Sequence, residues 1–307
     1  MSTAPVMEQL GSALCSVGES PLWAPHEQAL YWVDIEGRAL HRWQAASARA
    51  QTWALAERPG CIALHALGGL VCALESSLVH LQVHDDGHVD LVTLASVEHP
   101  QPGMRFNDGR CDRSGRFWVG SMVMNMALAA PAGQIARLAG RALMRPLSDP
   151  LTVPNGLAFS PDGATMYWSD TFAHRIFAFD FDGDQGSLSN QRVFAQFAPK
   201  VTGQDLSAYG GRPDGAAVDV EGAYWVAMFE GQRLLRLGAD GRLLQEVKLP
   251  VRCPTMPCFG GPDLKTLFIT TARANRPAAE LAEQLLAGRV LCLRVDVPGL
   301  PVNFAQP

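Results

Sequence analysis

One phrase recurs along the chain at intervals of about 40–57 residues: a turn, a short aromatic strand and then a second strand. The clearest copies place Ser20-Pro21 before residues 30–34 and Ser160-Pro161 before residues 166–170. Weaker copies cover residues 112–119 and 219–226, and degenerate ones cover residues 68–73 and 262–269. A β unit repeated at this length predicts a propeller, in which each blade brings one side chain to a common central channel.

The second strand of each repeat places a basic residue within alternating apolar positions, which is the period of a strand with one buried face. These strands are expected at residues 40–43, 78–81, 134–138, 175–179, 233–237 and 289–293. Six pairs predict an all-β, six-bladed β-propeller as a single domain over residues 1–307, and four polar residues described below add the expectation of a central metal site. Residues 1–14 are expected to be an N-terminal extension that closes onto the last blade. An aperiodic β-sandwich is the alternative.

Helix is scarce in this sequence. Only residues 278–286 have a helical pattern, with Pro277 at the start and Gly288 just after the end. The segment 200–213 is Gly-rich and polar, so we expect a long loop that projects from one face.

Charge and composition exclude several classes of function. The formal net charge of -5 argues against nucleic acid or an anionic membrane as the main partner. The apolar stretch 61–81 is interrupted by Gly68-Gly69 and Glu75, which indicates two strands and a turn rather than a membrane span. The first twenty residues lack the pattern of an export signal, and the seven cysteines show no metal-ligand spacing. We therefore expect a cytoplasmic protein with reduced thiols, monomeric by default.

Four oxygen-bearing side chains occupy equivalent places in four of the repeats. They lie 11 or 13 residues before the tryptophan of the aromatic strand: Glu19, Asn107, Asn155 and Asp214. Side chains at equal phase are expected to converge on the propeller axis, and carboxylate and amide oxygens are ligands for hard divalent cations. The alternative is that Asn107-Asp108-Gly109, Asn155-Gly156 and Asp214-Gly215 only form turns.

The phrases around these residues resemble the senescence-marker-protein/gluconolactonase/regucalcin family. The resemblance rests on residues 18–23, 105–110, 154–160, 213–215 and 258–261, which match in order over nearly the whole chain. It implies a six-bladed propeller that binds one divalent cation and, in most members, hydrolyses sugar lactones. By motif match it implies Glu19, Asn155 and Asp214 as metal ligands and Arg105 with Asn107 as the substrate-binding pair. A substrate-binding glutamate of regucalcin falls on Asn125, and the loop 200–213 is longer than usual, so the substrate itself stays open.

The expected activity is metal-dependent opening of a small aldonolactone to its aldonic acid. The cation would act as a Lewis acid on the lactone carbonyl. Either Asp214 would act as the general base that activates the attacking water, or a hydroxide bound to the ion would be the nucleophile. Calcium, zinc, manganese or iron(II) would each suit these oxygens. One alternative is a non-catalytic propeller that binds a cation or another ligand; another is a metal hydrolase acting on other lactones or on phosphoesters. The sequence contains no serine-hydrolase elbow, zincin pair or phosphate-binding glycine loop.

Overall fold

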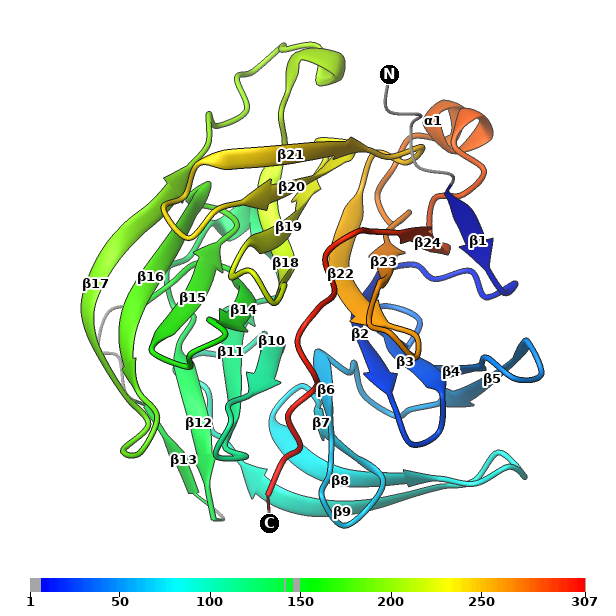
Figure 1. Cartoon of the computed structure of the whole chain (residues 1–307), viewed down its shortest axis with the longest axis vertical. Helices are drawn as coiled ribbons and strands as arrows, with labels where there is room; N and C mark the ends of the chain where they lie inside the picture. Colours follow the sequence, from blue (N-terminus) through cyan, green and yellow to red (C-terminus); the bar gives the residue numbers. More distant parts are fainter. Residues whose placement is uncertain (1–6, 141, 146–149, 307) are drawn as a thin grey trace.

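Six antiparallel sheets are arranged in a ring around a central axis in the computed structural model, which describes residues 7–140, 142–145 and 150–306 (Figure 1). Each sheet has four strands, and the innermost strand of each blade contacts the innermost strands of its two neighbours. The expected six-bladed all-β propeller is therefore confirmed, and the sandwich alternative is wrong.

The blades follow the order of the sequence from the axis outward. Blade 1 is β2 (Gly18–Ala24), β3 (Ala29–Asp34), β4 (Ala39–Gln44) and β5 (Arg49–Ala54); blade 2 is β6 (Cys61–Leu64), β7 (Leu70–Ala73), β8 (Ser77–Val83) and β9 (Val89–Ser96). Blade 3 is β10 (Met104–Cys111), β11 (Phe117–Val123), β12 (Ile135–Ala139) and β13 (Ala142–Met144); blade 4 is β14 (Pro154–Phe159), β15 (Thr165–Asp170), β16 (Arg175–Asp182) and β17 (Ser187–Gln196). Blade 5 is β18 (Arg212–Val218), β19 (Tyr224–Phe229), β20 (Arg233–Leu237) and β21 (Leu243–Lys248); blade 6 begins with β22 (Pro254–Gly260), β23 (Thr266–Thr271) and β24 (Val290–Arg294).

The N-terminal strand completes blade 6. β1 (Glu8–Leu10) pairs antiparallel with β24, with Leu10 opposite Val290. The last blade therefore contains strands from both ends of the chain. The ring is held closed by this backbone pairing as well as by side-chain packing.

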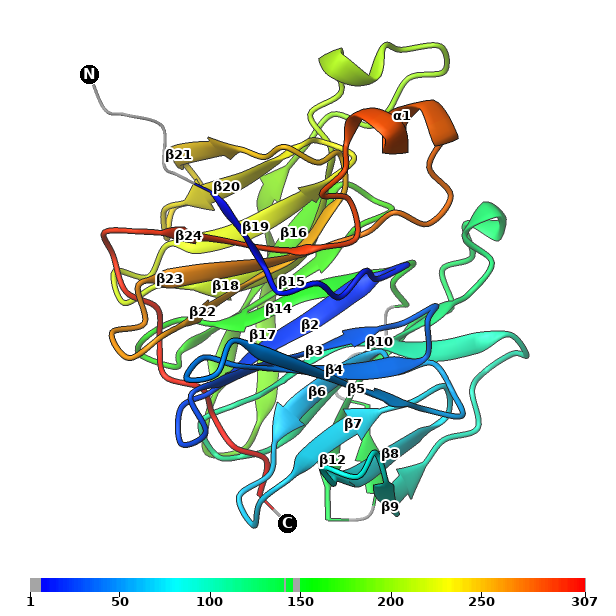
Figure 2. The ribbon, with the colours of Figure 1, turned by 90° about the vertical axis from the view of Figure 1, so that its right-hand side faces the viewer.

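Three long excursions leave the same face of the ring, which is at the right in Figure 2 and which we call the upper face. They carry the 3-10 turns η1 (Met126–Leu128) and η2 (Leu206–Ala208) and the helix α1 (Ala278–Glu283). The helix ends earlier than expected, because Gln284 is its C-cap and residues 285–288 form a turn. The long loop spans residues 197–211, since Arg212 and Pro213 belong to β18. No helix in the described ranges has the length and hydropathy needed to cross a bilayer.

The opposite, lower face is crossed by the end of the chain. Residues 296–306, here called the C-terminal strap, run from blade 6 over the axis toward blades 2 and 3 (Figure 1). Gly299 donates to the carbonyl of Leu264 in blade 6, and Ala305 donates to the carbonyl of Leu64 in blade 2. The upper and lower ends of the channel therefore differ: loops surround one, and the strap covers the other.

Candidate functional site

In four of the six blades the innermost strand contains a β-bulge in which two residues lie opposite one, and β22 in blade 6 has a different register shift, between Pro254 and Met256. In β14, for example, Gly156 and Leu157 together lie opposite Trp168. The same two-against-one pairing occurs in β2, β10 and β18. A bulge of this kind bends the strand and redirects the adjacent side chains. Each bulge lies at one of the four predicted positions: Glu19, Asn107, Asn155 and Asp214.

The bulge in blade 4 requires a glycine. Gly156 has a φ of 63°, in the left-handed region. A Cβ at this position would lie 2.3 Å from the Tyr224 hydroxyl oxygen, which donates to the Gly156 carbonyl at 2.6 Å. The Asn155-Gly156 phrase therefore lies at a bulge within β14 and not in a turn, unlike the alternative. It also places the Asn155 side chain among buried polar groups.

Three of these polar side chains and Arg105 form one chain of hydrogen bonds across blades 3, 4 and 5. Arg105 Nη1 donates to Asn107 Oδ1 at 2.6 Å, and Asn107 Nδ2 donates to Asn155 Oδ1 at 2.9 Å. Asn155 Nδ2 then donates to Asp214 Oδ1 at 2.7 Å. All four residues are buried. Asn107, Asn155 and Asp214, which occupy similar places in their repeats, are therefore in direct contact between neighbouring blades.

Glu19 approaches the same cluster from blade 1 without a hydrogen bond to it. Its Oε2 accepts from the backbone N–H of Ser20 at 2.9 Å. Burial raises the pKa of Glu19 well above its usual range, and the negative charges of Asp214 and Asp108 raise it further. Burial also raises the pKa of Asp214 to about 8, with Arg212 opposing the shift. Two buried carboxyl groups thus destabilise each other's charged forms.

The residues present fit a divalent cation. Glu19 and Asp214 offer carboxylate oxygens and Asn155 an amide oxygen, which together form a hard-ligand set. A cation between the carboxyl groups would remove the repulsion that raises the pKa of Glu19. Asn155 presents Nδ2 to Asp214 here, so coordination would use its other amide atom, Oδ1.

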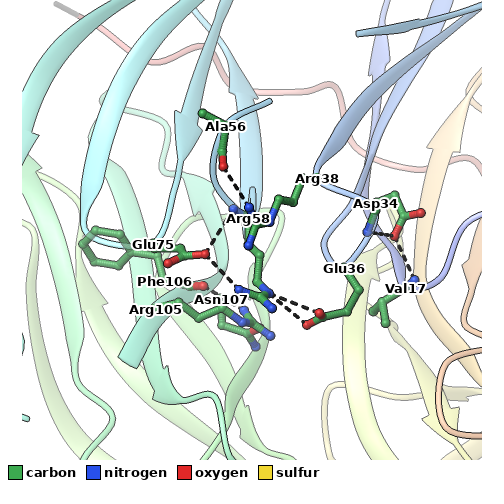
Figure 3. A network of polar contacts seen from close by, with 11 residues as sticks. Val17, Asp34, Glu36, Arg38, Ala56, Arg58, Glu75, Arg105, Phe106 and Asn107 are labelled. Carbon is green, nitrogen blue, oxygen red and sulfur yellow. Dashed lines mark hydrogen bonds and ion pairs between the residues drawn. The ribbon is translucent and has the colours of Figure 1, made fainter. Parts of the chain in front are cut away.

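Arg105 is a buried cation beside another arginine. Figure 3 shows the guanidinium groups of Arg105 and Arg58 close together, with Arg58 paired to Glu36 and Glu75. Burial lowers the pKa of Arg105, and the charge of Arg58 adds to this effect. Within the described residues Arg105 forms no ion pair with Asp108 or Glu98, two carboxyl groups close to it in the sequence. Its Nη1 donates instead to Asn107 and to the Phe106 carbonyl, as Figure 3 shows.

Asn125 lies apart from this cluster. It is exposed, directly precedes η1, and accepts from the backbone N–H of Ala127 through Oδ1 at 3.2 Å. The neighbouring residue Met124 donates to the Gly103 carbonyl, which places the turn beside the start of β10 and on the Arg105 side of the upper face. The structure thus brings five of the six predicted site residues together and leaves Asn125 at the rim.

The sequence reasoning missed two polar residues that contact or influence the cluster. Thr171 Oγ1 accepts from Asn155 Nδ2 at 2.9 Å, and the charge of Arg212 lowers the pKa of Asp214. Arg212 lies two residues before Asp214 in β18, so the sequence alone could have predicted that the two side chains are close together. Thr171 follows β15 and contacts Asn155 only through the antiparallel pairing of the two strands.

A second group of potential metal ligands lies in blade 1: Cys15, Asp34 and His41. Asp34 accepts from the backbone N–H groups of Ser16, Val17 and Gly37, the first two bonds being 2.8 and 2.9 Å long. Asp170 makes the equivalent pair of bonds in blade 4, to Thr152 and Val153, outside any such group of potential ligands among the described residues. Asp34 therefore has a structural role in holding a loop, and this group is separate from the predicted site.

Together, the ring of blades and the oxygen-rich cluster define a six-bladed propeller with a polar site in its channel. The model of the "SMP-30/Gluconolactonase/LRE-like region" matches residues 17–273, and the chain belongs to this family. A 6-deoxy-6-sulfogluconolactonase from Pseudomonas putida is 42% identical, with 92% of each chain covered, and regucalcin from Sus scrofa is 32% identical, with 94% of each covered. The crystal structure of a calcium-binding regucalcin from Agrobacterium tumefaciens superposes with a TM-score of 0.88 at 27% identity, over 100% of both chains.

Proposed function

We propose that this protein hydrolyses a sugar lactone to the open-chain acid, with a divalent cation held by Glu19, Asn155 and Asp214. The observation that carries the proposal is the buried cluster in which Asn155 bonds Asp214 and in which Glu19 and Asp214 both have raised pKa values. Two carboxyl groups in such a place are costly unless a cation joins them. The names of the relatives, a sulfogluconolactonase and regucalcin, support lactones and a divalent ion respectively.

The residues of the cluster divide the chemistry between them. When bound, the cation supplies a Lewis acid that polarises the lactone carbonyl. Asp214 takes a proton from the attacking water and returns it to the ring oxygen as the acyl C–O bond breaks, so that one water is consumed. Arg105 offers its remaining N–H groups to the sugar, and Asn107 and Asn125 are the other proposed substrate contacts.

The arginine pair points to the kind of lactone. On one side of the upper face, Arg105 forms no ion pair within the described residues, Arg58 beside it is paired with Glu36 and Glu75, and Asn125 is neutral. We propose that the preferred lactone carries an anionic group remote from its carbonyl, such as the sulfonate in the name of the Pseudomonas putida relative. Arg side chains bind such oxyanions through paired N–H donors.

The test is a panel of lactones with each metal ion. Metal-stripped protein receives calcium, zinc, manganese or iron(II), and acid release is followed from gluconolactone, other aldonolactones and 6-deoxy-6-sulfogluconolactone. We expect opening above the spontaneous rate with at least one ion and a preference for the sulfonated lactone. Arg58→Met should abolish that preference and leave gluconolactone turnover unchanged, while the exposed control Arg192→Met should change neither.

A second candidate is a propeller that binds calcium without catalysis. The likeness to a calcium-binding regucalcin favours it, since the same oxygen ligands would serve both functions. If no lactone is opened with any ion while the ion still binds, this second candidate replaces the first.

A further inference from the structure

The lower half of the channel contains a cavity that the proposed lactone site does not use. It has a volume of about 510 Å³, which is within the ~300–1,000 Å³ typical of small-molecule sites. Its walls are the distal halves of the innermost strands, with Leu22, Ala158 and Val218 among the lining residues. On the lower face, the cavity is closed by residues 300–304 of the C-terminal strap. Glu19, Asn155 and Asp214 do not line it.

Arg110 provides a positive charge in this cavity. Its Nε donates to the Leu157 carbonyl and its Nη2 to the Ala216 carbonyl, both at 2.8 Å, so the side chain is fixed across the channel. Over the described part of the chain, Nη1 has no hydrogen-bond partner and Arg110 forms no ion pair. Burial raises the pKa of Asp108 and the charge of Arg110 opposes this shift, while the Asp108 carboxyl group accepts from the backbone N–H groups of Gly109 and Leu157.

The rest of the lining matches an apolar molecule with an anionic end. Among the described residues, Arg113 also lines the cavity, and no aspartate or glutamate does. Apolar side chains from five blades and from the strap, including Met256, Phe259 and Phe304, make up most of the wall.

We propose that this lower cavity binds a lipophilic small molecule with a single anionic headgroup. The headgroup lies against Arg110, and the apolar part lies between the inner strands and the strap. The charge complementarity of two arginines without a lining carboxylate selects an anion over a cation or a neutral alcohol. The site is at the other end of the channel from the lactone site, so it does not depend on the proposed function.

The strap offers the ligand a way in. It is tied by backbone hydrogen bonds at Gly299 and at Ala305. Between these ties, the Asn303 side chain donates to the Cys111 carbonyl at 3.2 Å. Residues 300–304 belong to no strand, so this stretch can bend outward without breaking a sheet.

Calorimetric titration of the full-length protein with decanoate, decanol and decyltrimethylammonium tests the proposal. We expect saturable binding of decanoate at one site per chain, at least tenfold weaker binding of decanol, and no binding of decyltrimethylammonium. Equal affinity for all three would show a non-specific apolar surface and overturn the proposal. The absence of decanoate binding at millimolar concentration would also overturn it.

Two variants locate the site. Arg110→Met keeps the length of the side chain without its charge and should weaken decanoate binding at least tenfold while sparing decanol; the exposed control Arg49→Met should change neither. Val302→Trp places a larger side chain in the part of the strap that lines the cavity, so it should reduce the binding of both ligands. Thermal unfolding checks that each variant is folded. Unchanged decanoate affinity in folded Arg110→Met would place the ligand elsewhere and contradict the assignment.

Discussion

Asn155 Nδ2 donates to Asp214 Oδ1 at 2.7 Å across the boundary between blades 4 and 5, although the two residues are 59 positions apart in the sequence. The bond joins the bulges of two innermost strands, β14 and β18, which pack side by side. Any shift of one blade against the other would therefore alter the proposed cation site directly.

Removing the charge of Asp214 tests its proposed role as ligand and base. Asp214→Asn keeps the shape of the side chain, and we expect lactone turnover to fall by at least ~100-fold, because a positioned acid–base group contributes about 10²–10⁴-fold. The midpoint of thermal unfolding should not fall, since the change removes a buried carboxyl group whose pKa is raised. The exposed control Asp240→Asn should keep full activity. Turnover above a tenth of the wild-type value in Asp214→Asn would contradict the role.

The stability of the metal-free protein should depend on pH. Burial raises the pKa of Asp214 to about 8 from a usual value of 3.8, so the folded state holds a proton that the unfolded state releases. This contribution is complete at acidic pH and is lost as the pH rises toward 8. We expect the unfolding temperature of chelator-treated protein to fall between pH 5 and pH 8. A saturating cation should restore it more at pH 8 than at pH 5, because binding to the folded state adds stability. A flat profile without metal would contradict this account.

Arg105 is expected to act mainly in substrate binding. Arg105→Met should raise KM by about tenfold or more, because hydrogen bonds from a charged donor contribute roughly 1.5–3 kcal/mol. Arg105→Lys keeps the charge but not the planar fork and should recover only part of the affinity. Steady-state kinetics with the preferred lactone separates KM from kcat. An unchanged KM in Arg105→Met would exclude this residue from the substrate site.

Glu230 is expected to anchor the long loop of residues 197–211 on the upper face. It accepts from Lys200 at 3.1 Å and from Arg276 at 2.8 Å, and it lies 3.8 Å from Arg212. Glu230→Gln leaves these cations without their shared carboxylate, so we expect a loss of ~1–3 kcal/mol in the free energy of unfolding. Limited proteolysis should cut within residues 197–211 faster than in wild type. Asp263→Asn, which affects an exposed ion pair with Arg294 in blade 6, is the matched control. Equal proteolysis of both variants would refute the anchor.

The repeat phrase was sufficient to predict the number of blades, because each copy contributes two adjacent strands to its own sheet. It also predicted which residues lie in the channel, although the tryptophans are not strictly equivalent. Trp168 lies opposite the bulge in blade 4. In blade 3, Trp118 pairs with Arg110, which is two positions after the bulge of β10. Asn155 also directly precedes its bulge whereas Asn107 lies within its own, so the spacings of 13 and 11 residues do not mark strictly equivalent positions.

Other features depend on contacts that a repeat pattern does not encode. The helix stops at Glu283 because the chain turns there, although an apolar pattern continues to Leu286. Asn125 is at the rim because the η1 turn carries it away from β11. The lower cavity exists only because the strap crosses the axis, and nothing in residues 296–306 by themselves indicates where that segment lies.

The central claim is that Glu19, Asn155 and Asp214 hold one divalent cation. Its most direct test is calorimetric titration of metal-stripped protein with manganese and with calcium. We predict one ion per chain for the wild type with at least one of the two metals, and no measurable binding for the folded double variant Glu19→Gln/Asp214→Asn. No binding to the wild type, or an undiminished stoichiometry in the double variant, would contradict the claim.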